Sequence, residues 1–304
     1  MLNNLYFWKN KSGGTTRRSI LSKIVIALLV LLIAGVGGWY YFVMLPAQVA
    51  HEESIARQLQ AAQKMQSDIV SVENFYTKSL EGASIERAIE FLSELRFSEF
   101  QFYILNIKAL NFKCDIKACY FGYRYDKGEL LTLPEKTLWG KSYLASVPGG
   151  KGKNKDKIDF EYKKIESKLN NNALQRMYNS KKSLLLESCD RVISYILTYN
   201  SFVNSLTAKS KKNNDKENGT IVIKSMPKSS VINLESGLPG KVKAYGLMAG
   251  TWELNYKGSD RVNEAIMNMQ VLLFKQAFRD AFLIKRIEST NSGMKVSGGL
   301  VCKD

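Results

Sequence analysis

The chain has 304 residues, a hydrophobic fraction of 45% and a formal net charge of +16. That length is enough for a membrane anchor and one or two domains, and most of the chain is apolar enough to build a core. The basic residues are dispersed and no RNA-recognition or zinc-finger motif accompanies them. We therefore expect no nucleic-acid partner.

Residues 24–45 form a continuous apolar run without a charged residue. At about 1.5 Å rise per residue, a helix of this length crosses a hydrocarbon core of about 30 Å. The aromatic residues Trp39, Tyr40 and Tyr41 predict an interfacial anchor near its C-terminal end. Pro46 follows at once and predicts a break or kink in the helix.

Charges on the two sides of this run predict its orientation. The preceding residues are basic without an acid, and the first acids beyond the run are Glu52 and Glu53. The positive-inside rule then makes residues 1–23 a cytoplasmic basic tail, residues 24–45 a transmembrane helix and the remainder an exported part. A cleaved signal peptide is the alternative, but the run is longer than a signal core. The basic residues are Lys9, Lys11, Arg17, Arg18 and Lys23.

Residues 47–80 are expected to form a membrane-proximal coiled-coil helix, because apolar residues recur there every seven positions. This stalk would pair with another helix, in a homodimer or a heterodimer. An amphipathic helix that packs on its own domain is the alternative. The predicted partner interface consists of Ile55, Ala62, Met65, Ile69, Val72 and Tyr76.

Two regions repeat one order of predicted elements. Residues 81–150 predict a first αββ unit, with a helix at 85–95 and strands near 101–110 and 118–125. Residues 241–304 predict a second, βαββ unit. Its elements are a strand at 251–256, a helix at 261–275, strands at 278–288 and 294–301, and a turn at Asn291-Ser292-Gly293.

An offset of 177 residues superimposes Ala88 on Ala265, and similar apolar pairs follow at the same offset. A strand–helix–strand–strand unit is half of a ferredoxin-like sheet, so the pattern favours two copies of such a half. A coincidence between two amphipathic segments is the alternative. The other superimposed pairs are Ile89 with Ile266, Leu92 with Met269, Leu95 with Leu272, Ile107 with Ile284, and Leu110 with Ile287.

Residues 151–240 differ in character, since they are rich in Lys and Asn. We expect an insertion with helical content, including a helix at 183–206 and a polar loop at 209–219. Short apolar runs at 221–223 and 231–234 predict two strands.

The four cysteines suit an oxidising compartment. Cys114 and Cys119 flank a predicted turn, where a disulfide would connect two strands, and Cys189 with Cys302 could form a second bridge. Small buried apolar side chains are the alternative role for cysteines.

The chemistry of an enzyme is not evident. The one histidine, His51, lies just beyond the apolar run, which leaves no histidine for a nucleophilic pair in the exported part. Zinc-ligand spacings and a Walker motif are absent from the sequence. We expect no enzyme, no cofactor and no metal, although a carboxylate pair in a hydrolase stays open.

The order of parts, together with the stretch from Trp252-Glu253-Leu254 through 262–273 to 284–287 and 296–301, resembles a known family. It is similar to PilO- and GspM-type inner-membrane platform proteins of type IV pilus assembly and type II secretion. The size also resembles bitopic accessory proteins of the type IVb pilus branch. The Lys-rich middle departs from the compact family domain.

The resemblance implies a scaffold in the bacterial inner membrane, single-pass, with a periplasmic domain that contacts other pilus or secretion platform proteins and has no catalytic residues. The expected fold is α+β, with one N-terminal transmembrane helix, a coiled-coil stalk and ferredoxin-like αββ and βαββ units around a helical insertion. The alternatives are an extracytoplasmic ligand-binding or sensory protein, and a subunit of another secretion or conjugation system.

Overall fold

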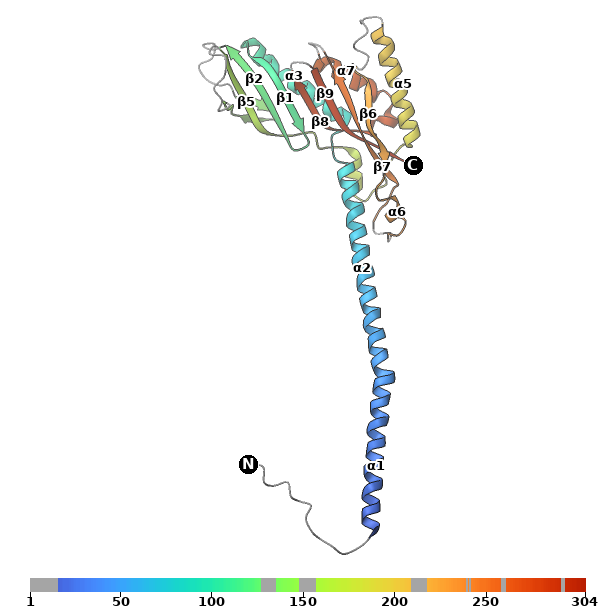
Figure 1. The fold of residues 1–304 in the computed structure, drawn as a ribbon. Helices are drawn as coiled ribbons and strands as arrows, with labels where there is room; N and C mark the ends of the chain where they lie inside the picture. The colour runs from blue at the N-terminus through green and yellow to red at the C-terminus, as the bar shows by residue number, and fades with distance from the viewer. Residues whose placement is uncertain are drawn as a thin grey trace, which may run out of the picture. The chain divides into compact units, whose positions relative to one another are not determined.

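A computed structural model describes residues 16–126, 135–147, 157–208, 218–238, 240, 242–257, 261–290 and 293–304 (Figure 1). The chain divides into two compact units, residues 1–66 and residues 67–304. Three predicted features fall wholly or largely outside the described residues. They are most of the basic tail, the turn at Asn291 and Ser292, and most of the loop at 209–219.

Helix is the only regular structure described in the first unit. Helix α1 (Thr16–Trp39) continues through a π-helical turn, η1 (Tyr40–Met44), into α2 (Leu45–Ser79), which extends into the second unit. The predicted break at Pro46 is therefore wrong, because the backbone stays helical there.

The second unit is built on a seven-stranded sheet with the order β5-β2-β1-β8-β9-β7-β6, and every neighbouring pair is antiparallel. A separate hairpin pairs β3 (Lys136–Leu138) with β4 (Lys141–Tyr143). The sheet strands are β1 (Lys108–Asp115), β2 (Ala118–Asp126), β5 (Lys157–Glu166), β6 (Ile221–Lys228), β7 (Leu247–Tyr256), β8 (Phe282–Thr290) and β9 (Gly293–Lys303).

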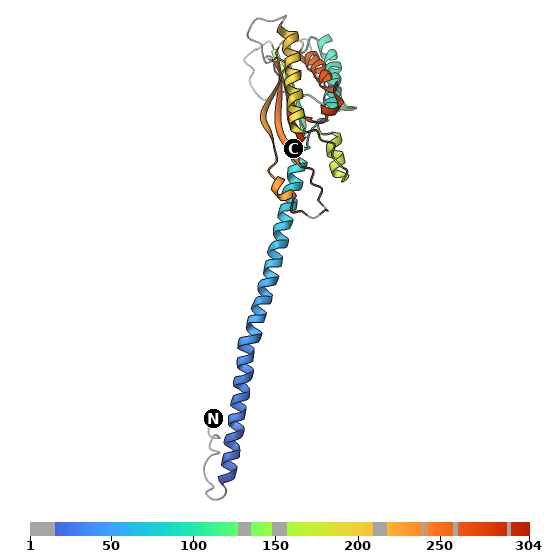
Figure 2. The ribbon, with the colours of Figure 1, turned by 90° about the vertical axis from the view of Figure 1, so that its right-hand side faces the viewer.

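Helices cover one face of this sheet. The two central helices, α3 (Ile85–Ile104) and α7 (Arg261–Leu273), pack against each other there, and α5 (Cys189–Ala208) lies beside them (Figure 2). The main core lies between these helices and the sheet, and Trp252 and Phe282 are among its fully buried members. The remaining short helices are α4 (Ala173–Asn179), α6 (Ile232–Glu235) and α8 (Gln276–Arg279).

A smaller core lies on the other face of the sheet. There Val72, Tyr76 and Leu80, from the end of α2 and the residue after it, cluster with Leu283 and Val301 of the sheet. Successive side chains of a strand lie on opposite faces of the sheet, so one strand can contribute to both cores. In β8, Phe282 and Ile284 belong to the main core, while Leu283 between them belongs to the smaller one. The rest of this face carries mainly polar and charged side chains.

The sheet consists of two similar halves. In the second half, β9 lies between β7 and β8, and α7 connects these two outer strands; in the first half, β2 lies between β1 and β5. The halves meet where β1 pairs with β8, and Phe112 lies opposite Ser289. These two residues are 177 positions apart, which is the offset that superimposes the two regions of the sequence. The superimposed pairs Ala88 and Ala265, Leu92 and Met269, and Leu95 and Leu272 are all buried.

The sequence misplaced several elements. The strand expected at 101–110 is wrong in its first part, because α3 continues to Ile104, and β1 begins only at Lys108. The strand expected at 231–234 is instead the short helix α6. Residues 151–240 are not simply an insertion, since they supply β5 and β6, the two edge strands of the sheet. The helix expected at 183–206 is present as α5.

One edge of the sheet is covered by a side chain. Asn200 of α5 donates a hydrogen bond from its amide nitrogen to the carbonyl oxygen of Ile221, at 2.8 Å, and accepts one from the Ile221 N–H, at 2.7 Å. This amide therefore forms the two bonds that a further strand would form with Ile221 of β6. Pro227, near the other end of β6, has no N–H to offer.

Candidate interaction surfaces

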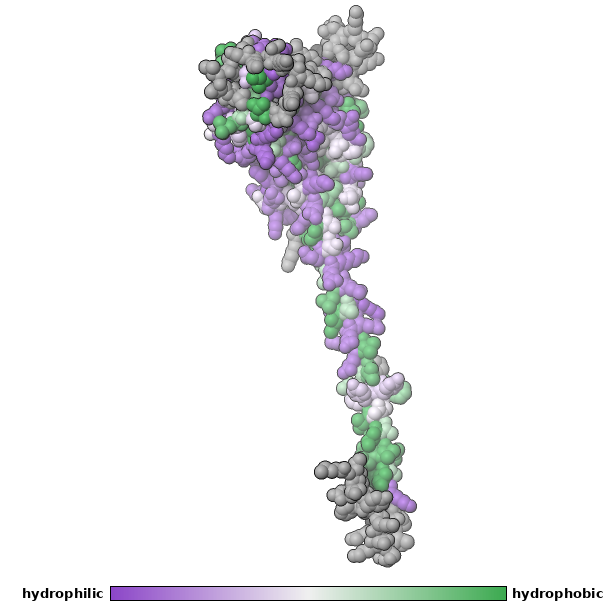
Figure 3. All heavy atoms as spheres, turned by 60° about the vertical axis from the view of Figure 1, so that its left-hand side comes forward, coloured by the Kyte–Doolittle hydropathy of each residue, from purple (hydrophilic) through white to green (hydrophobic). Residues whose placement is uncertain are grey.

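The apolar segment of the first unit is exposed along its length, and Figure 3 shows hydrophobic side chains gathered along it. Its large apolar side chains between Ile24 and Leu45 are 38–78% exposed. Trp39, Tyr40 and Tyr41, the predicted interfacial anchor, are all among these exposed side chains. By length and composition this helix is able to cross a membrane.

The predicted stalk surface continues along α2 within the first unit. Ile55 and Met65 are 43% and 45% exposed, and Ala62 between them is exposed as well. The sequence also contains a member that the heptad reading missed, Leu59, which is 58% exposed. It follows Ile55 by four residues and precedes Ala62 by three, so it lies on the same helical face. We call Ile55, Leu59, Ala62 and Met65 the stalk surface.

Two residues predicted for this partner interface are instead buried in their own domain. Val72 and Tyr76 are fully buried, and Ile69 is half-buried. The Tyr76 hydroxyl accepts hydrogen bonds from the N–H groups of Tyr245, at 2.7 Å, and Leu247, at 3.3 Å. Burial also raises the pKa of this hydroxyl. The alternative of a helix packed on its own domain therefore holds for this last part of α2, because these side chains complete the smaller core.

The turn from α2 to α3 is fixed by backbone and side-chain bonds. Ala83 and Ile284 exchange backbone hydrogen bonds at 2.8 and 2.9 Å. The buried side chain of Asn172 donates to the carbonyl oxygens of Leu80 and Gly82, both at 2.8 Å. Gly82 has a φ of 138°, and a Cβ there would lie 2.9 Å from the Ile284 carbonyl oxygen, so glycine is required. The domain thus holds the end of α2 firmly.

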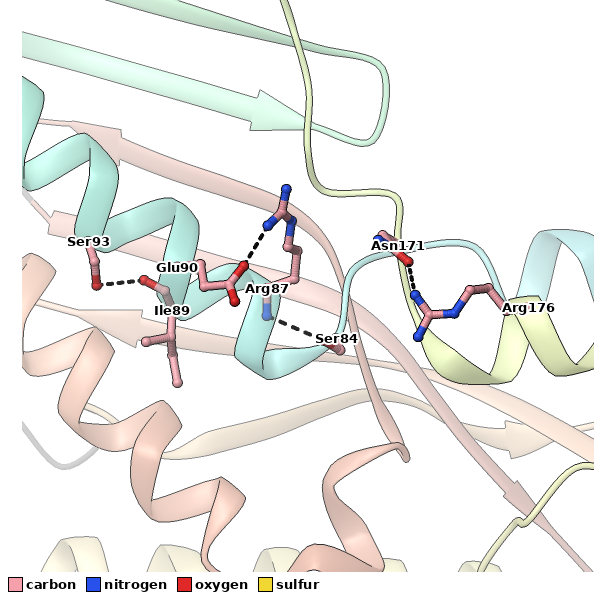
Figure 4. Close-up of polar contacts among 7 residues, drawn as sticks. All are labelled: Ser84, Arg87, Ile89, Glu90, Ser93, Asn171 and Arg176. Carbon is pink, nitrogen blue, oxygen red and sulfur yellow. Dashed lines mark hydrogen bonds and ion pairs between the residues drawn. The ribbon is translucent and has the colours of Figure 1, made fainter. Parts of the chain in front are cut away.

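Polar contacts surround the beginning of α3 (Figure 4). Ser84 caps the helix by accepting a hydrogen bond from the Arg87 N–H at 3.3 Å. The Arg87 guanidinium lies 2.5 Å from the Glu90 carboxylate, and Arg176 of α4 donates to Asn171 at 2.7 Å. These contacts line a polar cavity of about 350 Å³. Most of its charged side chains form ion pairs with one another, and Arg176 bonds to an amide, which suits a structural role.

Two disulfides crosslink the second unit. Cys114 and Cys119 lie directly opposite each other on β1 and β2 and are bonded. Cys189, the first residue of α5, is bonded to Cys302 of β9 and so joins the helical layer to the sheet. Disulfides of this kind suggest a domain outside the cytoplasm.

The structure also contains a buried lysine that sequence reasoning missed. Lys136, on the β3–β4 hairpin, is only 2% exposed. Its ammonium nitrogen lies 4.7, 5.3 and 5.1 Å from the ring centroids of Phe102, Phe121 and Tyr123 and donates to the Ser98 hydroxyl at 3.1 Å. Burial lowers the pKa of Lys136 to about 8, while the nearby Glu99 carboxylate acts in the opposite direction. The three rings hold the cation through their π-faces, and the hairpin is thereby attached to α3 and β2.

Metal ligands do not gather in the part of the chain that the structure describes, since no group of three or more His, Cys, Asp or Glu there is placed to hold an ion. Taken together, the fold defines an α+β protein: a seven-stranded antiparallel sheet with helices, in a chain with a long apolar N-terminal helix consistent with a membrane anchor. Comparison with protein-family models, curated proteins and solved structures found no match.

Proposed function

We propose that this chain is a structural component of a bacterial envelope machine rather than an enzyme. It is anchored in the inner membrane, with its N-terminus in the cytoplasm and its C-terminal domain in the periplasm. The observation that carries this proposal is that one chain combines an exposed apolar helix of membrane-spanning length with a domain crosslinked by two disulfides. Disulfides persist in oxidising compartments, which supports export of the domain.

The order of strands and helices in the sheet supports membership of a platform complex. The order β7-α7-β8-β9, with β9 between β7 and β8, is that of half a ferredoxin-like sheet, and the first half of the domain resembles it. In the first half β5 occupies the place of the missing leading strand, although it comes last in the chain. With the resemblance to PilO- and GspM-type proteins, this favours type IV pilus assembly or type II secretion as the machine.

The stalk surface is the contact that we assign to a partner helix. Exposed apolar side chains on one face of a long helix are stabilised when a second helix covers them. A partner that is anchored in the same membrane would place its own helix at the same distance from the membrane as the stalk surface. We therefore propose that the partner is either a second copy of this chain or another platform protein. Val72 and Tyr76 take no part in this contact, because the domain already buries them.

Cysteine crosslinking in native membranes tests this assignment. The four natural cysteines are paired with each other, so a new cysteine provides the only free thiol. We expect Leu59→Cys to form an oxidative crosslink to a second copy or to a partner that also carries a cysteine on its stalk. The matched control is Gln60→Cys, an exposed position that faces away from all four stalk-surface residues and should crosslink far less.

Equal crosslinking at residues 59 and 60 would show that contact is random and would remove the stalk assignment. The anchor has its own test, which is fractionation of the full-length chain. We expect it in the inner membrane, with a reporter fused after Asp304 active only in the periplasm. Recovery in the soluble fraction without detergent would contradict the membrane proposal.

A further inference from the structure

The part of the sheet that neither the helices nor the end of α2 cover carries a groove of about 510 Å³. The turn between β1 and β2 lines it on one side and β6 on the other, with β7, β8 and β9 between them. Figure 1 shows these strands side by side, with α3 and α7 behind them. The Thr251 and Ser297 side chains and the Gly298 backbone lie along this groove and offer small polar groups to a ligand.

Four cationic side chains line the groove: Lys117, Lys224, Lys285 and Arg286. Only two acids accompany them, Asp115 and Glu253, and both already have partners. Asp115 closes the β1–β2 turn by accepting hydrogen bonds from the N–H groups of Lys117 and Ala118, at 2.8 and 3.1 Å. Glu253 lies between two lysines, 3.1 Å from Lys224 and 2.5 Å from Lys295.

The two cations at the β1–β8 side carry the surplus charge. The Arg286 guanidinium lies 3.6 Å from Glu288, a carboxylate that it shares with Lys113, at 3.5 Å. Among the described residues the Lys117 ammonium has no ion-pair partner. Both side chains are exposed. An incoming carboxylate could therefore pair with them without first breaking a buried bond.

We propose that this groove binds an acidic, extended segment of a partner protein. The charge of the groove and the +16 net charge of the chain complement such a segment and would speed its encounter. A peptide can place its carboxylates at Lys117 and Arg286 and its uncharged residues at Asp115 and Glu253. A nucleic acid or another uniform polyanion would meet repulsion at those two carboxylates. The proposal goes beyond the assembly role above and holds whichever machine the chain serves.

Fluorescence anisotropy with a labelled peptide in which glutamate and serine alternate tests this assignment on the full-length chain in detergent. We expect Lys117→Glu with Arg286→Glu to weaken binding by about tenfold, because two attractions become repulsions. The matched control is Arg96→Glu with Lys182→Glu, which makes the same change in net charge at exposed cations outside the groove. That control should bind within about twofold of the natural chain, since distant charges are screened by salt.

Two results would overturn the proposal. One is equal weakening by the groove variant and the control variant, which would mean that the peptide responds only to net charge. The other is displacement of the peptide by a single-stranded oligonucleotide of equal charge as readily as by the same peptide without its label, which would make the groove a general polyanion site. If the double variant fails to fold, the single variants Lys117→Gln and Arg286→Gln replace it, and each should weaken binding measurably while the near-ultraviolet circular dichroism stays unchanged.

Discussion

At the scale of single residues, the most informative side chain is Lys136. This lysine gives no sign in the sequence that it will be buried, because lysines are rarely buried. Its position depends on rings contributed by α3 and β2, which only the folded chain brings together. The same holds for Asn172, whose bonds reach residues about ninety positions earlier.

The lowered pKa of Lys136 predicts a pH dependence of stability. Its folded value is about 8, against an ordinary value of 10.5 that the unfolded chain would keep. Between these two values the unfolded state binds more protons than the folded state, so this residue makes the free energy of unfolding rise with pH. The rise amounts to at most roughly 3 kcal/mol. Below pH 8 the penalty of burying the charge is fully present.

Replacement of this lysine by methionine should remove its pH-dependent contribution to the free energy of unfolding. Methionine fills similar space and packs well against rings. Urea unfolding of the natural chain and of Lys136→Met, each at pH 7 and at pH 10, gives the comparison. The difference between the two proteins in free energy of unfolding should shift in favour of the natural chain at the higher pH. An unchanged difference would mean that Lys136 keeps its ordinary pKa in the folded state.

At the scale of elements, amphipathic periodicity predicted α3, α5 and α7, because one apolar face recurs in each. It failed where a helix and a strand meet. Phe102 lies in a run that suits a strand, yet the helical face of α3 continues through it and buries its ring. The edge strand β5 escaped notice because its charged residues alternate with buried rings only between Asp159 and Lys163, within a Lys-rich region. Stalk residues Ile55 and Met65 were predicted, whereas Leu59 was missed.

Helix α2 has an exposed stretch and a buried stretch. An aspartate introduced in the one should therefore change stability far less than an aspartate introduced in the other. Val72→Asp places a charge in the smaller core and should lower the free energy of unfolding by several kcal/mol. Leu59→Asp changes an exposed position and should change it by less than about 0.5 kcal/mol.

Chemical denaturation of the full-length chain in detergent, followed by near-ultraviolet circular dichroism, compares the two variants. Leu59→Asp should still weaken recovery of the partner helix after mild-detergent purification. A domain that tolerates Val72→Asp would show that the end of α2 is not part of its core.

At the scale of the whole molecule, the two disulfides differ in the length of chain that they close. Cys189 and Cys302 are 113 positions apart, whereas Cys114 and Cys119 are separated by only 5. In the chain-entropy model these loops correspond to stabilisation of about 5 and about 2 kcal/mol. Paired replacement by alanine should therefore destabilise the domain more at residues 189 and 302 than at residues 114 and 119.

Thermal unfolding of the two double variants, without reductant, measures this order. Addition of a reductant to the natural chain should cause a loss greater than that of either variant, since it opens both bridges. Equal losses in the two variants would mean that strain or residual structure, rather than loop length, determines the contribution of each bridge.

The amide of Asn200 at the rim of β6 has a consequence for a protein confined to a surface. Molecules anchored in one bilayer meet far more often than the same number free in solution. Unpaired edge strands can form hydrogen bonds with each other when two such molecules meet. A side chain that already occupies the Ile221 peptide group removes one such adhesive site. In the membrane location that we propose, this bond lowers the tendency of crowded copies to aggregate through β6.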